Sequence, residues 1–112
     1  MKKIEAIICP EKVSEVCTAL DTAGHPGVTL SHVEEQGDQQ GWVNQVRCIS
    51  HTVNLLGKTK VEVVVKDGDA ERIVKAIRDV ALTGQAGDGN IFVHDMVDAI
   101  RIRTSESGVA AI

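Results

Sequence analysis

The chain has 112 residues, the size of one modest domain. Lysine and arginine together number 12 and aspartate and glutamate 16, and this acidic balance argues against a nucleic-acid partner. The apolar fraction of 43% excludes wholesale disorder, and no apolar stretch is long enough to insert into a membrane. The three cysteines lack CxxC spacing, so we expect unpaired thiols and a cytoplasmic protein.

The first half of the chain predicts two strands separated by one helix. Along residues 2–9, apolar side chains alternate with mostly charged ones, which is typical of a strand. Pro10 suits a helix start, and apolar residues then recur at helical spacing as far as Gly24. Residues 27–34 predict the second strand.

The second half repeats the pattern of strand, helix and strand. Residues 58–66, KTKVEVVVK, are rich in valine and predict the third strand. Asp69 is expected to cap a second helix. The apolar face of that helix consists of Ile73, Ile77, Val80 and Ala81. Residues 90–94 predict a fourth strand, and residues 100–103 a short extended tail.

The predicted order β-α-β-β-α-β is that of the α+β ferredoxin-like sandwich, in which two helices cover one face of an antiparallel sheet. Residues 1–112 form one domain. Residues 36–57, between the second and third strands, far exceed the usual hairpin loop of about 2–5 residues, which indicates a functional or disordered loop. The sheet face under the helices is expected to carry Ile4, Ala6, Ile8, Val28, Leu30, Val61, Val63 and Val65.

The opposite face of the sheet is too apolar for plain solvent and too polar for a core. It carries Glu5, Ile7, Thr29, Ser31, Val33, Glu62 and Val64. Such a mixture suits a subunit interface with a ligand beside it.

Three glycines, Gly84, Gly87 and Gly89, crowd the segment LTGQAGDGNIFV, residues 82–93. The segment matches neither GxxxxGK[ST] nor GxGxxG after a strand. Two interpretations stay open: a helix C-cap followed by a turn, or a cradle of backbone N–H groups for an anion. The basic residues that could complete such a cradle are Lys58, Lys60, Arg101 and Arg103.

Other chemistry is weakly indicated. No combination of serine, cysteine, histidine and aspartate is close enough in sequence to be interpreted as catalytic. Cys48, in the long loop, is the cysteine whose reactivity we would test. RNA-recognition modules share the predicted element order but need aromatic residues on the sheet, and the aromatic residues here are Trp42 and Phe92.

Two segments of the chain resemble the signatures of the P-II signal-transduction proteins. TGQAGDGNIFV (83–93) is similar to TGxxGDGKIFV, IRIRTSESG (100–108) is similar to the IRTGExG tail, and MKKIEAIICPEK resembles the usual P-II opening. The resemblance covers the whole chain. It implies a homotrimeric regulator, not an enzyme, that binds ADP, AMP or ATP in clefts between subunits. Residues 36–57 would be the T-loop, which binds a regulated membrane transporter or metabolic enzyme, and residues 95–112 the C-terminal tail.

The resemblance also assigns individual residues by position. Those around the nucleoside would be Ile7, Thr29, Glu62 and Val64. Those around the phosphates would be Gly87, Asp88, Gly89, Arg101 and Arg103. The further nucleotide-binding positions would be Lys58, Thr83, Gly84 and Asn90. Gln39 and Lys58 match positions that help to hold magnesium and 2-oxoglutarate. The partner-binding loop would use Trp42, Arg47, Cys48 and His51.

The chain departs from the family motifs at several positions. Asn90 replaces the lysine of GDGK and Asp38 replaces a phosphate-binding arginine, so we expect ADP or AMP to bind at least as well as ATP. His51 replaces a tyrosine that is uridylylated in some relatives, so this modification is not expected there. Two alternatives remain: a slow nucleotide hydrolase, and a sensor of a signal related to carbon or to metals.

Overall fold

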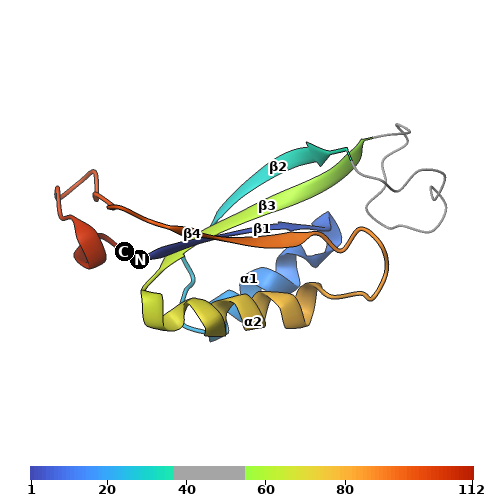
Figure 1. Ribbon diagram of the computed structural model, residues 1–112, viewed down its shortest axis with the longest axis horizontal. Helices are drawn as coiled ribbons and strands as arrows, with labels where there is room; N and C mark the ends of the chain where they lie inside the picture. The colour runs from blue at the N-terminus through green and yellow to red at the C-terminus, as the bar shows by residue number, and fades with distance from the viewer. Residues whose placement is uncertain (37–54) are drawn as a thin grey trace.

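The computed structural model describes residues 1–36 and 55–112. Within these residues, four strands and two helices follow the predicted order (Figure 1). The strands are β1 (Lys2–Ile8), β2 (Thr29–Glu35), β3 (Leu56–Val65) and β4 (Asn90–Asp95). The helices are α1 (Val13–Thr22) and α2 (Ala70–Ala81). No helix among the described residues is long and apolar enough to cross a membrane.

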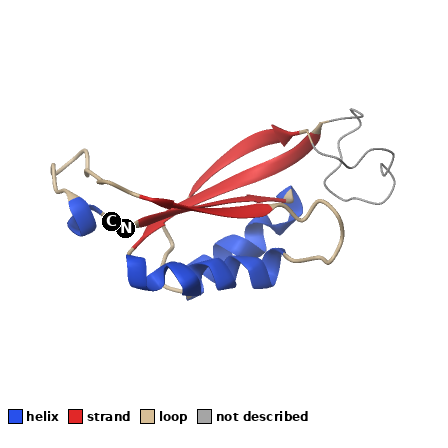
Figure 2. Ribbon diagram, viewed as in Figure 1, coloured by secondary structure: helices blue, strands red, loops and turns tan. Residues whose placement is uncertain are grey.

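The sheet has the strand order β2-β3-β1-β4, and every neighbouring pair is antiparallel. Both helices lie on one face of this sheet and leave the other face open (Figure 2). The α+β ferredoxin-like fold predicted from the sequence is therefore confirmed.

The core lies between the helices and the covered face of the sheet. It consists of Ile4, Ala6, Ile8, Val16, Leu20, Val61, Val63, Val65, Ile73, Ile77 and Ala81. Val80 packs against this cluster in a partly buried position. Because directly opposed residues of antiparallel strands point to the same face, the pairs Ile4–Val63 and Ala6–Val61 bring the buried positions of β1 and β3 together.

Two predicted roles of single side chains are wrong. Leu30 is paired with Val61, as expected for the covered face, but 46% of it is exposed. The reason is that β2 is an edge strand, which curves away from the helices (Figure 1). Asp69 immediately precedes α2, but its side chain makes no capping hydrogen bond. Its carboxylate lies 3.3 Å from the guanidinium of Arg72 and 3.6 Å from Nε2 of His25 instead.

The C-terminal tail is not extended at residues 100–103, as the sequence had suggested. Residues 102–104 form a turn, which is closed by an isolated antiparallel bridge between Ile100 and Ser107. A short 3₁₀ helix, Gly108–Ala111, ends the chain. The tail therefore folds back on itself beyond the end of β4 (Figure 1).

Candidate functional site

The glycine segment joins α2 to β4 at one end of the sheet (Figure 1). Gly84, Gly87 and Gly89 all have positive φ, at 82°, 94° and 96°, a backbone conformation that favours glycine. Helix α2 ends at Ala81 and its C-cap is Leu82, whose backbone is extended, so none of the three glycines caps the helix. The C-cap interpretation is wrong, and the glycines shape the turn that follows.

Gly89 brings this turn directly against the backbone of β1. A Cβ atom at this position would lie 1.7 Å from the carbonyl oxygen of Ile7, closer than any side chain allows. At Gly84, by contrast, nothing lies within 4 Å of such an atom. The close approach explains why glycine is required immediately before Asn90, which pairs with Ile7 in the sheet.

Asp88 is the centre of the hydrogen bonding within the segment. Its Oδ2 accepts the backbone N–H groups of Thr83 and Gly84, both at 3.0 Å, and its Oδ1 accepts the hydroxyl of Thr83. Partial burial raises the pKa of Asp88, but these hydrogen bonds and the charge of Lys58 outweigh that effect. The net result is a pKa below the ordinary value for aspartate.

We expect the contribution of Asp88 to stability to depend on pH. A lowered pKa means that the unfolded chain binds protons more readily than the folded chain, so the contribution is present above the unfolded pKa of about 3.9 and is lost as the pH falls through the folded pKa. Urea unfolding of the wild type and Asp88→Asn between about pH 7 and about pH 2 measures this. The difference in unfolding free energy, about 1–2 kcal/mol near neutrality, should shrink in acid. A difference that does not change with pH would contradict the assignment.

Lys58 lies behind the glycine segment and is 1% exposed. Its Nζ donates a hydrogen bond to the carbonyl oxygen of Gly87. Burial lowers the pKa of Lys58, and the negative charges of Glu35 and Asp88 partly oppose this effect. The structure thus places a cationic group of β3 against the turn, as the anion-cradle interpretation requires.

Cys9, just beyond β1, also touches the glycine segment, with its Sγ 3.4 Å from the carbonyl oxygen of Gly87. Cys9 is disulfide-bonded, whereas Cys17 on α1 is a free thiol. The expectation of unpaired cysteines is therefore wrong for Cys9, whose bonding cannot be inferred from spacing along the sequence.

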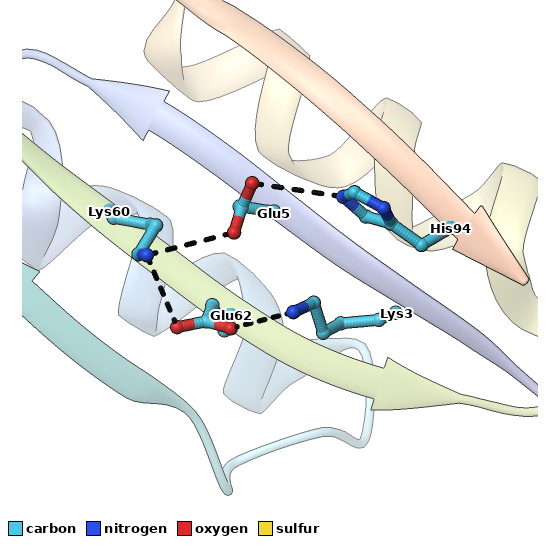
Figure 3. Close-up of polar contacts among 5 residues, drawn as sticks. All are labelled: Lys3, Glu5, Lys60, Glu62 and His94. Carbon is cyan, nitrogen blue, oxygen red and sulfur yellow. Dashed lines mark ion pairs between the residues drawn. The ribbon is translucent and has the colours of Figure 1, made fainter. Parts of the chain in front are cut away.

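The open face of the sheet carries a network of ion pairs (Figure 3). Glu5 and Glu62 lie directly opposite one another on β1 and β3, an arrangement of like charges that is unfavourable on its own. Nζ of Lys60 lies 3.7 Å from Glu5 and 3.9 Å from Glu62, and Lys3 and His94 pair with Glu62 and Glu5 at 3.2 and 3.7 Å. Every carboxylate in this network therefore has two basic neighbours.

Seven of the residues that the resemblance assigned to one nucleotide site line two separate hollows. The first, of about 290 Å³, is lined by Ile7, Asp88, Gly89 and Asn90, together with Arg78 of α2 and Leu82 just after it. The second, of about 480 Å³, is lined by Thr29, Glu62 and Val64, together with Lys3, His25 and Ile112. The assigned nucleoside residues are thus divided between the hollows, because Ile7 lies in the first and the other three in the second.

Arg101 and Arg103 lie beyond β4, at the end of the sheet opposite the glycine segment (Figure 1). The 6 residues of β4 lie between them and the glycines, a span of about 17 Å at the usual rise per residue. Nη1 of Arg101 lies 2.9 Å from Glu106 in the tail. The alternation of the two arginines along an extended tail was a wrong prediction, since this part of the chain turns. Within one chain, neither arginine reaches the glycine cradle.

Some predicted site residues lie outside the described part of the chain, and some residues that line the hollows were not predicted. Gln39, Trp42, Arg47, Cys48 and His51 lie outside the described residues. The sequence interpretation missed Lys3, His25, Arg78, Leu82 and Ile112 as lining residues. For Arg78 and Leu82 a signal existed, because Arg78 lies in the last turn of the helix and Leu82 follows it, just before the glycines. For His25 and Ile112 none existed, since only the folded chain brings them beside the sheet.

A family model described as "Nitrogen regulatory protein P-II" matches residues 1–106. The chain therefore belongs to the P-II family, whose members are signalling regulators and not enzymes.

Individual relatives agree with this assignment along their full length. The chain is 47% identical over 112 residues to a nitrogen regulatory protein P-II of Rhizobium meliloti (strain 1021), and this covers 100% of both chains. It is 45% identical to nitrogen regulatory protein P-II 2 of Methanothermobacter thermautotrophicus, covering 100% of this chain and 97% of the relative. The family is thus supported by proteins from distant sources.

Proposed function

We propose that this chain senses adenine nucleotides in clefts between the subunits of a homotrimer and signals their binding to a regulated protein through residues 36–57. The observation that carries the proposal is the division of the site residues between opposite ends of one sheet. A nucleotide whose phosphates occupy the glycine cradle needs the remaining groups from a second copy of the chain.

In the proposed cleft, each subunit supplies a different half. One contributes the end of the sheet with Lys58 and the glycine segment, which we call the loop half. Its neighbour contributes Thr29, Glu62 and Val64 with Arg101 and Arg103, which we call the tail half. A contact between two different surfaces forms a closed ring when the rotation between subunits allows closure, and three copies would form three equivalent clefts.

The open sheet face supports assembly as well. Phe92, which pairs with Glu5 on this face, is 47% exposed, and the carboxylate side chains of the ion-pair network are partly buried. A face of mixed polar and apolar character, without a helix over it, is suited to burial against another subunit.

The ligand of the site would be ADP, AMP or ATP, with magnesium held by its phosphates and by Gln39. Lys58, whose ammonium lies against the glycine segment, would offer a cation to a 2-oxoglutarate carboxylate. The regulated protein would be a membrane transporter or a metabolic enzyme of nitrogen utilization, and the cytoplasm is where such nucleotides are abundant. A signal related to carbon or metals remains the alternative. For the hydrolase alternative, Asp88 would be a poor general base, because both of its oxygens already accept hydrogen bonds.

A mixing experiment tests whether the cleft is shared. Asn90→Glu places an anion in the loop half, and the double variant Arg101→Ala with Arg103→Ala removes the cations of the tail half. Each variant alone should lose ATP binding in calorimetry. Trimers reassembled from an equal mixture should regain roughly a quarter of the wild-type sites, because each half of a cleft is intact in about half of random pairings.

Two outcomes would contradict the proposal. One is a failure of the mixture to regain any binding while light scattering still shows trimers. The other is a stable wild-type monomer at micromolar concentration. Circular dichroism on each variant confirms that the loss of binding does not come from unfolding.

A further inference from the structure

We infer that Asp88 is a positioning residue: it ties the start of the glycine segment to its end and so aims the backbone N–H groups of the segment at the phosphates, without touching them itself. This inference rests on the proposed function. It concerns a residue that the family motif places within the cradle, where an anion would be expected to weaken phosphate binding.

The hydrogen bonds of Asp88 define the tie. The carboxylate spans from residue 88 to the N–H groups of Thr83 and Gly84 and to the Thr83 hydroxyl. The same hydroxyl accepts the N–H of Gln85 at 3.2 Å, so the first turn of the segment is joined to the tie. These contacts hold the segment in its conformation before a ligand arrives. Less conformational entropy of the segment is then lost on binding.

Two neighbouring contacts fix the other side of the segment. The backbone of Gly89 lies against the carbonyl oxygen of Ile7. The ammonium of Lys58 donates to the carbonyl oxygen of Gly87 and attracts the carboxylate of Asp88. The negative charge of Asp88 is thus offset by several hydrogen-bond donors and a buried cation, which leaves little of it to repel a phosphate.

Two possible roles of Asp88 predict opposite effects of the same substitution on ATP affinity. If Asp88 were only an anion near the phosphates, Asp88→Asn would remove a repulsion and tighten ATP binding. If it positions the segment, Asp88→Asn, which keeps one neutral acceptor oxygen where the carboxylate has two charged ones, loosens the tie and weakens ATP binding by about tenfold or more. Adenosine lacks phosphates, so its affinity should change by less than about twofold.

Calorimetry with ATP, ADP, AMP and adenosine makes this comparison. Thr83→Val, which removes one donor of the tie and changes no charge, should shift the affinities in the same direction as Asp88→Asn. Thr83→Ser, which keeps the hydroxyl, should bind ATP more tightly than Thr83→Val. Asp79→Asn on α2 is the matched control for the loss of an exposed carboxylate, since Asp79 pairs only with Lys75 among the contacts described.

Hydrogen exchange at the Gly84 amide tests the tie without any nucleotide. The amide should exchange about tenfold faster or more in Asp88→Asn, and at the wild-type rate in Asp79→Asn. ATP binding that is equal or tighter in Asp88→Asn, or a Gly84 amide whose exchange does not change, overturns the inference. A wild type that binds no nucleotide overturns the proposed function instead, and the exchange measurement still decides whether the tie exists.

Discussion

Replacing Gly89 by alanine is expected to destabilise the protein by about 2–5 kcal/mol. The backbone at Gly89 has a φ of +96°, which costs a residue with a side chain about 1–2 kcal/mol. The added Cβ would also lie 1.7 Å from the carbonyl oxygen of Ile7, and relieving such an overlap costs typically about 1–3 kcal/mol. Urea unfolding followed by circular dichroism measures the change.

Gly84→Ala is the matched control for this substitution. Gly84 also has a positive φ, of +82°, but no atom lies within 4 Å of an added Cβ. It should therefore show the backbone cost alone, about 1–2 kcal/mol. Equal effects of the two substitutions would mean that the segment does not lie against β1 in solution.

Removing both Arg101 and Arg103 is expected to weaken ATP binding by roughly 10²- to 10⁴-fold. Each hydrogen bond to a charged group contributes about 1.5–3 kcal/mol, and every 1.4 kcal/mol is about tenfold in affinity. The ion pair of Arg101 with Glu106 does not prevent this role, since both side chains are more than 40% exposed and such pairs contribute about 0–1 kcal/mol. Calorimetry of the double alanine variant measures the loss.

The loss should follow the number of phosphates, so that ATP is affected more than ADP, and ADP more than AMP. Arg72→Ala is the control, because Arg72 is another exposed arginine with a carboxylate partner, Asp69, and lies in neither hollow. ATP binding within about threefold of wild type in the double variant would show that the tail does not take part in the cleft.

The sequence predicted the fold well where local pattern and burial agree. The alternation of Ile4, Ala6 and Ile8 identified the covered face of β1, and all three side chains are buried. Leu30 follows the same rule but is exposed, because alternation shows which face a residue is on and not how far the helices extend over that face. The position of β2 at the sheet edge is a property of the topology alone.

The candidate site was less predictable, for a related reason. The motif identified the glycine segment, but it did not show that Asp88 turns inward to Thr83 or that Gly89 touches Ile7. These contacts depend on how the segment folds between α2 and β4. Nor did the motif show that Arg101 lies at the far end of the sheet, because its position depends on the course of the chain through β4.

The two faces of strand β3 constrain how the sequence of this protein can change during evolution. Glu62 and Val64 from the tail half lie on its open face, Val61 and Val63 lie on its covered face, and the buried Lys58 of the loop half lies near its start. In the proposed trimer, one strand thus serves two different clefts and the core at once. An insertion or deletion of one residue within β3 would exchange the two faces, with charged groups moving into the core and valines into the clefts. Changes of length are therefore tolerable in the connections between strands but not within β3, whatever partner the protein acquires.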